Sequence, residues 1–290
     1  MKKLALILVF VLMMTACGSK VVPLKEVTVD YWDSNKGIKE FKGNYIVTTE
    51  NEVYYQDREE WIKDEVLTSF DGDFEMIDRY YFISGGVMYY HMAGMEDLAM
   101  VMAPADLQIG KAFCEANMFW AIDEEGKFRV FTQPESGAFQ EIELPEQMVE
   151  TGVKDFVGRI YITQDGEARE FVWAYDGPNH IHEELYANAF IASNATLVDA
   201  GNGHAIVQSG TGDLYPAAHS KKIAAISEPV IAAYGYSVIQ TSKGYFCIEN
   251  DKVVPAAALN AYKDRVVSIG TRGINTPVMV LDDGKVYEAK

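Results

Sequence analysis

Two histidines, His180 and His182, stand two residues apart in a segment rich in carboxylates. On a β-strand they would share one face, because alternate side chains point to the same side. With Asp176 they form a set of imidazole and carboxylate groups of the kind that binds zinc. No third ligand follows at a recognisable spacing, so we interpret the segment as a solvated loop. The sequence therefore predicts no bound metal and no cofactor.

Aromatic side chains in the same segment indicate a different chemistry. Trp173 and Tyr175 could stack against a sugar ring or a peptide. The segment falls in the longest interval between the repeated turns of the chain, and extra residues within a repeat usually form a loop on the binding face. The alternative is that both aromatic residues pack inside the fold. The candidate ligand-binding residues are Trp173, Tyr175, Asp176, His180 and His182.

Motifs of catalysis and of phosphate binding do not occur in the sequence. It contains no Gly-x-Ser-x-Gly and no glycine-rich loop that opens a helix. Acidic turns, such as residues 123–126, lack the alternating ligands and the closing glutamate of a calcium loop. These observations favour a binding protein and leave a glycan hydrolase or lyase as the alternative. They do not decide whether the protein is an enzyme.

Seven segments share one pattern of an apolar strand, a polar turn and a second strand, which is a strong hairpin signal. They are residues 44–56, 80–91, 118–131, 159–172, 204–217, 244–256 and 277–289. The first strand of each is apolar on both faces, as expected of a strand packed between two other sheets. Shorter apolar runs precede many of the hairpins, which leaves room for about four strands in each repeat.

These repeats predict an all-β fold, a seven-bladed β-propeller with repeats of about 38 residues, in which the last hairpin completes the seventh blade. The alternative is an open array of β-hairpin repeats, which would need capping at its ends. Helical signals are confined to two short segments, residues 145–153 and 227–234.

Two stretches resemble known repeat families. Residues 265–290 resemble one repeat of the regulator-of-chromosome-condensation type, and the resemblance implies a seven-bladed propeller. Residues 69–90 are similar to the bacterial DKNYY repeat, with an acidic turn followed by Phe and a closing pair of tyrosines at 89 and 90. Neither resemblance brings a site residue to this sequence.

The N-terminal residues have the layout of an export signal. Two lysines precede an apolar run that ends at Ala16 and is shorter than the roughly 20 residues of a membrane span. The run leads into "MTAC", residues 14–17, which resembles the lipobox of bacterial lipoproteins. The resemblance implies cleavage before Cys17 and lipid on its sulfur. The predicted organisation is a lipoprotein signal peptide over residues 1–16, a tether over residues 17–23 and the propeller domain over residues 24–290.

The composition is strongly acidic. The net charge is −18, and loss of residues 1–16 with their two lysines moves it to −20. Such a surface repels nucleic acid and anionic headgroups, which excludes a nucleic-acid partner. Cys114 and Cys247 lie three repeats apart in a ring of seven, too far for a disulfide, so we expect two buried thiols.

Taken together, the sequence predicts a lipid-anchored protein of the cell envelope, on the outer membrane in a Gram-negative cell. Its partners are the membrane, through lipid on Cys17, and an envelope protein, peptide or glycan that binds the propeller loops. The alternative is a glycan hydrolase or lyase whose site lies at the propeller mouth.

Anchoring through Cys17 is tested by the Cys17→Ser variant. Because the lipid would be attached to this sulfur, the variant would lack all of the acyl chains that anchor the protein. We therefore expect it to leave the membrane fraction. The measurement is fractionation of cells followed by a high-salt wash. A variant that still sediments with washed membranes would show that anchoring does not depend on Cys17.

Overall fold

In the computed structural model of the chain, the described residues fall in thirteen ranges with gaps between them. These are 22–27, 37–42, 45–57, 60–77, 80–92, 95–100, 107–115, 118–132, 139–173, 185–201, 203–216, 221–272 and 276–289. None of the helices within these ranges is long and apolar enough to cross a membrane.

Seven antiparallel sheets follow one another along the chain, and each is a meander whose strands keep the sequence order. The first blade contains β1 (Ile38–Lys42), β2 (Tyr45–Thr48), β3 (Val53–Asp57) and β4 (Glu60–Lys63), and the second contains β5 (Glu75–Met76), β6 (Tyr81–Ser84), β7 (Val87–Tyr90) and β8 (Ala99–Met100). The third blade contains β9 (Ile109–Glu115), β10 (Met118–Asp123), β11 (Phe128–Thr132) and β12 (Gln140–Glu141). The fourth blade contains β13 (Val153–Val157), β14 (Ile160–Thr163), β15 (Ala168–Trp173) and β16 (Leu185–Ala192).

The fifth blade contains β17 (Thr196–Gly201), β18 (His204–Gln208), β19 (Asp213–Pro216) and β20 (Ala224–Ala225). The sixth blade contains β21 (Val230–Tyr234), β22 (Val238–Thr241), β23 (Gly244–Glu249) and β24 (Lys252–Pro255). The seventh blade contains β25 (Val266–Arg272), β26 (Thr276–Leu281) and β27 (Val286–Glu288). Short helices lie in three of the connections between blades: α2 (Glu65–Ser69), α3 (Glu146–Thr151) and α4 (Ala257–Tyr262), the last followed by a 3₁₀ turn, η1 (Lys263–Arg265).

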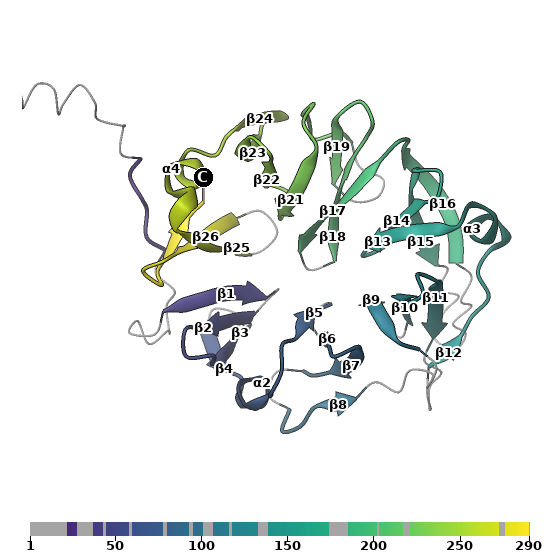
Figure 1. The fold of residues 1–290 in the computed structure, drawn as a ribbon, viewed down its shortest axis with the longest axis horizontal. Coiled ribbons are helices and arrows are strands. Elements are labelled where there is room, and N and C mark those ends of the chain that lie inside the picture. Colours follow the sequence, from purple (N-terminus) through teal and green to yellow (C-terminus); the bar gives the residue numbers. More distant parts are fainter. Residues whose placement is uncertain are drawn as a thin grey trace, which may run out of the picture.

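The sheets stand side by side in a closed ring, with the first strand of each blade toward the centre (Figure 1). The first and last blades are neighbours, because the backbone N–H of Phe41 on β1 donates to the Ser268 hydroxyl on β25 at 3.4 Å. The chain is therefore a seven-bladed β-propeller, which confirms the fold predicted from the repeats. An open array of hairpins would leave β1 and β25 at opposite ends.

The outer strand of the seventh blade comes from the other end of the chain. Val27 N–H donates to the Val286 carbonyl and Glu288 N–H to the Lys25 carbonyl, each at 2.9 Å. This short N-terminal segment thus pairs with β27 and closes the ring. At Val22, the first described residue, the carbonyl accepts a hydrogen bond from the Tyr262 hydroxyl at 2.9 Å. The sequence predicts the ring but not this closing strand.

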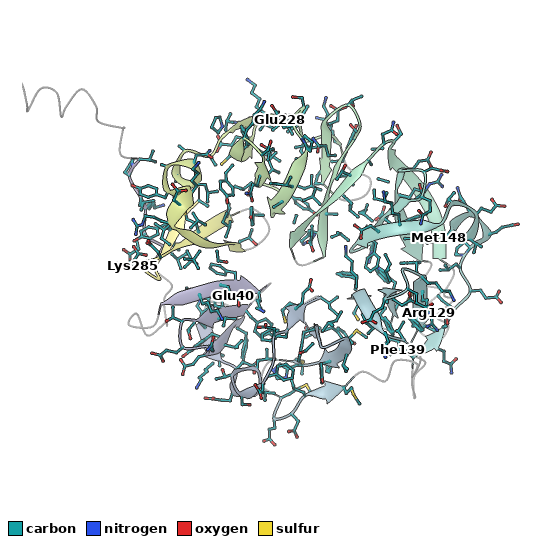
Figure 2. All side chains as sticks on the ribbon, viewed as in Figure 1. Glu40, Arg129, Phe139, Met148, Glu228 and Lys285 are labelled. Carbon is teal, nitrogen blue, oxygen red and sulfur yellow. The ribbon has the colours of Figure 1, made fainter. Side chains whose placement is uncertain are left out.

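Alternate residues of each middle strand pack into two different interblade clusters, and side chains fill the spaces between the sheets (Figure 2). On β26, Val278 and Val280 join Ile38 and Ile46 of the first blade. Met279 and Leu281 point the other way, into a cluster with residues of the sixth blade and of α4. This arrangement explains why the strand is apolar on both faces, since each face meets a neighbouring sheet.

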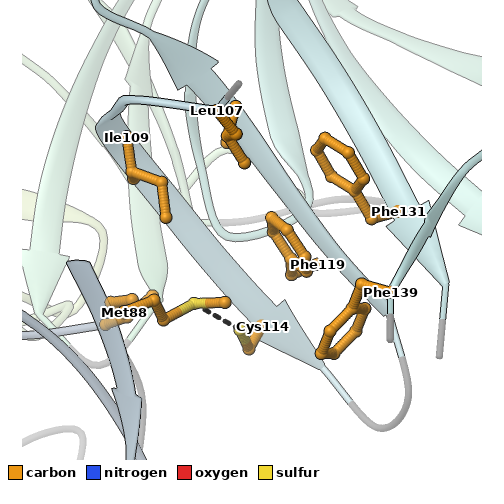
Figure 3. Packing of buried hydrophobic residues seen from close by; sticks show 9 residues of the cluster. Met88, Leu107, Ile109, Cys114, Phe119, Phe131 and Phe139 are labelled. Carbon is orange, nitrogen blue, oxygen red and sulfur yellow. Dashed lines mark hydrogen bonds between the residues drawn. The ribbon is translucent and has the colours of Figure 1, made fainter. Parts of the chain in front are cut away.

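The two cysteines lie in separate clusters, as their spacing in the repeats predicts. Cys114 packs between the second and third blades, where its Sγ donates to the Met88 Sδ at 3.4 Å beside Phe119 and Phe131 (Figure 3). Cys247 is buried in the cluster that contains Met279. Both keep their thiols and no disulfide joins them, which confirms the prediction.

Two local predictions need correction. Residues 244–256 form β23 and β24, the third and fourth strands of their blade, and not the second and third as in the other six hairpins. The turn signal there is genuine, because Asn250 and Asp251 adopt φ of 49° and 62°, but it joins a later strand pair. Residues 227–234 are not helical: they contain β21, which pairs with β22. The other helical signal is confirmed by α3.

Removing the last hairpin should unfold the protein. Val278, Met279, Val280 and Leu281 are each 0% exposed. Burying one such side chain contributes about 1.5–3 kcal/mol, so their joint loss rivals the roughly 5–15 kcal/mol that stabilises a typical domain. We expect a chain truncated at residue 276 to aggregate or to lose its cooperative urea transition, measured by circular dichroism. A soluble truncate with a cooperative transition would contradict the closed ring.

Candidate functional site

The residues predicted from the sequence to bind a ligand fall mostly outside the described part of the chain. Tyr175, Asp176, His180 and His182 do so, as does Cys17. Trp173 is the last residue of β15 and pairs with Leu185 of β16. The long segment therefore connects the third and fourth strands of the fourth blade. Ligand binding there stays a prediction, and within the described ranges no group of three or more His, Cys, Asp or Glu side chains could hold a metal ion.

A pocket of about 320 Å³ lies at the centre of the ring. Its walls come mainly from β5, β9, β13 and β17, the first strands of four successive blades. Most lining residues lie where these strands end, for example Ile77, Val157 and Gly201. A smaller pocket of about 130 Å³ shares Gly201 and continues along the first strands of the remaining blades. Together the two pockets form one mouth of the central channel, hereafter the channel mouth.

Charged side chains face the larger pocket from three of its walls. The Lys111 ammonium on β9 lies 2.8 Å from the Asp155 carboxylate on β13 and 5.4 Å from the centre of the Phe156 ring. Glu75 on β5 and Asp199 on β17 are exposed and line the same pocket. Asp199 accepts a hydrogen bond from the Gly201 backbone N–H at 2.6 Å, which orients its carboxylate.

Glycines allow the blades to approach closely at the channel mouth. Gly158 has φ of +55°, and a Cβ on it would lie 2.0 Å from the Gly203 carbonyl oxygen. Gly203 has φ of +72°, and a Cβ there would lie 2.1 Å from the Phe113 ring. The indole N–H of Trp120 donates to the Gly158 carbonyl at 2.8 Å and holds this turn in place. The wall between the third, fourth and fifth blades is therefore tightly packed.

A histidine stands next to this wall but is engaged within the fold. The Tyr236 hydroxyl and the His204 Nδ1 are 3.1 Å apart and join the fifth and sixth blades. Burial lowers the pKa of His204, although the Asp199 charge acts in the opposite direction. Burial also raises the pKa of Tyr236. The lowered pKa of His204 favours its neutral imidazole near neutral pH, so His204 contributes little positive charge to the pocket.

A second histidine is buried away from the channel mouth. His91 Nε2 lies 2.7 Å from Asp64 Oδ2, and both side chains are almost fully buried. The other oxygen of Asp64 accepts the Leu67 N–H at 2.9 Å and caps helix α2. This pair joins the first two blades, and its burial keeps it from contact with a dissolved ligand.

Sequence reasoning missed the pocket residues Glu75, Lys111 and Asp199. Glu75 lies on a strand of two residues, and Lys111 and Asp199 each stand alone among apolar or small neighbours, so no repeating pattern marks them. Their common location follows from the arrangement of the first strands around the ring.

Comparison with known proteins identifies no family for this chain. No family model matches the chain, and no curated protein matches its sequence. Among solved structures, YCF48 from Cyanidioschyzon merolae is 11% identical with a TM-score of 0.44, covering 92% of this chain and 98% of that chain. A streptogramin B lyase is 15% identical with a TM-score of 0.43, covering 92% and 96%. The WD40 β-propeller domain of Doa1 is 10% identical with a TM-score of 0.36, covering 88% and 94%.

The close approach of Gly203 to Phe113 can be tested with a matched pair of alanine variants. Gly126 has φ of +83°, but a Cβ added there would meet no heavy atom within 4 Å, so Gly126→Ala carries backbone strain alone, about 1–2 kcal/mol. Gly203→Ala adds a clash, which costs a further 1–3 kcal/mol or so. Urea unfolding measures both losses. Equal losses would contradict the tight wall at the channel mouth.

Proposed function

We propose that this protein is a lipid-anchored component of the cell envelope that binds a protein, peptide or glycan partner at the channel mouth and catalyses no reaction on it. The observation that carries the proposal is the central pocket of about 320 Å³, with walls from four blades. Ligand pockets usually measure about 300–1,000 Å³. A pocket at the lower end of this range suits one side chain, a short segment or a single sugar unit.

The chemistry of the pocket supports binding. Its surface is about equally polar and apolar: Ile77, Phe113 and Phe156 contribute to the apolar part, and two of its charged groups, Lys111 and Asp199, are held by an ion pair and a hydrogen bond. Apolar surface combined with oriented polar groups is typical of a recognition site. The two histidines in the described part of the chain are bonded to Asp64 and Tyr236. Neither is paired with a serine or cysteine that it could activate as a nucleophile.

The lipid anchor would hold this site near a membrane. Four residues separate the lipobox-like residues 14–17 from Val22, which contacts the propeller through Tyr262. At about 3.5 Å for each residue, the chain from Cys17 to Val22 spans at most roughly 17 Å. The partner is accordingly one that reaches the membrane surface, such as another envelope protein or an envelope glycan.

The proposal is tested by a pull-down from envelope extract with the soluble form that starts at Gly18. Glu75→Trp would fill the pocket from an exposed position on β5. Glu124→Trp is the matched control on the exposed turn between β10 and β11. We expect Glu75→Trp to lose at least about nine-tenths of the captured partner, because an indole excludes a ligand from a small pocket. The control should retain it.

A third variant separates the channel mouth from the long loop of the fourth blade. Trp173→Ala with Tyr175→Ala removes the aromatic residues predicted from the sequence. Loss of the partner in this variant, together with retention in Glu75→Trp, would move the site to the loop and overturn the proposal. A partner retained by all three variants would overturn it as well.

A further inference from the structure

We propose that the central pocket takes the basic side chain, lysine or arginine, of a partner polypeptide. This inference rests on the proposed function and names the chemistry of the ligand at that site. Two carboxylates, those of Glu75 and Asp199, line the pocket together with a single ammonium group, that of Lys111. Lys111 in turn forms an ion pair with Asp155, which lies next to the lining residue Phe156.

The ammonium group of the pocket is already engaged. Lys111 lies 2.8 Å from Asp155, and the same carboxylate oxygen accepts the Phe156 backbone N–H at 2.8 Å. The other two carboxylates have no such partner: among the described residues, neither Glu75 nor Asp199 forms an ion pair with a lysine or an arginine. His204, which interacts electrostatically with Asp199, is hydrogen-bonded to Tyr236. Within the described part of the chain, the pocket therefore carries two negative charges that no lysine or arginine compensates.

The positions of these two carboxylates suit a long cationic side chain. Glu75 is on β5 and Asp199 on β17, so they belong to opposite ends of the set of four blades that builds the pocket. Between them lie Ile77, Phe113 and Phe156. Lysine and arginine bury their aliphatic stems on apolar surface while the charged group remains with polar partners, and aromatic faces also attract cations.

An anionic or neutral ligand fits the same pocket poorly. A carboxylate or phosphate would meet Glu75 and Asp199 at close range with no ammonium group left to compensate, because Lys111 is shared with Asp155. A neutral apolar group would fill the volume but would desolvate two carboxylates without pairing them, which is unfavourable. The volume of about 320 Å³ also limits the ligand to one or two side chains.

The test uses capped seven-residue Gly/Ser peptides with a single central residue: lysine, arginine, norleucine or glutamate. Binding to the soluble form that starts at Gly18 is measured by ligand-observed NMR or calorimetry. We expect the lysine or arginine peptide to bind at least about tenfold more tightly than the norleucine peptide, since one charge-assisted hydrogen bond suffices for this factor. The glutamate peptide should not bind.

A matched pair of double variants separates the pocket from the acidic surface in general. Glu75→Gln with Asp199→Asn removes the two pocket charges, and we expect it to weaken binding of the lysine or arginine peptide at least tenfold or so. Glu124→Gln with Asp165→Asn makes the same chemical changes on exposed turns outside the pocket and should leave the dissociation constant unchanged.

Three outcomes would overturn the inference: no binding of either basic peptide, equal binding of the lysine and norleucine peptides, or equal weakening by both double variants. The last would show non-specific attraction to an acidic surface. The envelope pull-down keeps this failure distinct from failure of the proposed function. A partner lost in Glu75→Trp but retained in Glu75→Gln with Asp199→Asn would leave the channel mouth as the site and exclude a basic side chain as its ligand.

Discussion

Closure of the ring is the constraint on which the rest of the structure depends. A middle strand such as β26 can bury both of its faces only if a sheet stands on each side of it. The sixth blade and α4 cover Met279 and Leu281, and the first blade covers Val278 and Val280. The second contact exists because β1 meets β25 and the N-terminal segment pairs with β27. Without closure, two of these side chains would face water.

The same constraint shapes the channel mouth. Seven blades that pack face to face bring the ends of their first strands together, and small residues allow the closest approaches. A Cβ on Gly270 would lie 2.4 Å from the Phe41 ring, just as one on Gly203 would meet Phe113. Longer side chains on β5 and β9, such as Glu75 and Lys111, border the larger of the two pockets. The pocket thus arises because long and small side chains alternate unevenly around a nearly regular ring of blades.

The sequence predicts the features that depend on neighbouring residues. Middle strands apolar on both faces and their polar turns are local patterns, and they lead to the correct fold. The closing strand is not local, because Lys25 pairs with Glu288 across 263 residues and its sequence carries no turn signal. The pocket is missed for a similar reason: β5 has two residues, too few to show a period. Only the ring determines that Glu75 lines the same pocket as Asp199.

Overall charge and local charge have separate roles in this protein. A net charge of −18 attracts cations in general, but charges farther apart than about 8 Å are largely screened at physiological salt. Composition can therefore influence the rate of encounter without selecting a partner. Selection of one partner over another requires groups that lie within contact distance and are held in position. At the channel mouth, the hydrogen bonds from Gly201 to Asp199 and from Trp120 to Gly158 hold two such groups. At the proposed site, selectivity would follow from this packing and not from the acidity of the chain.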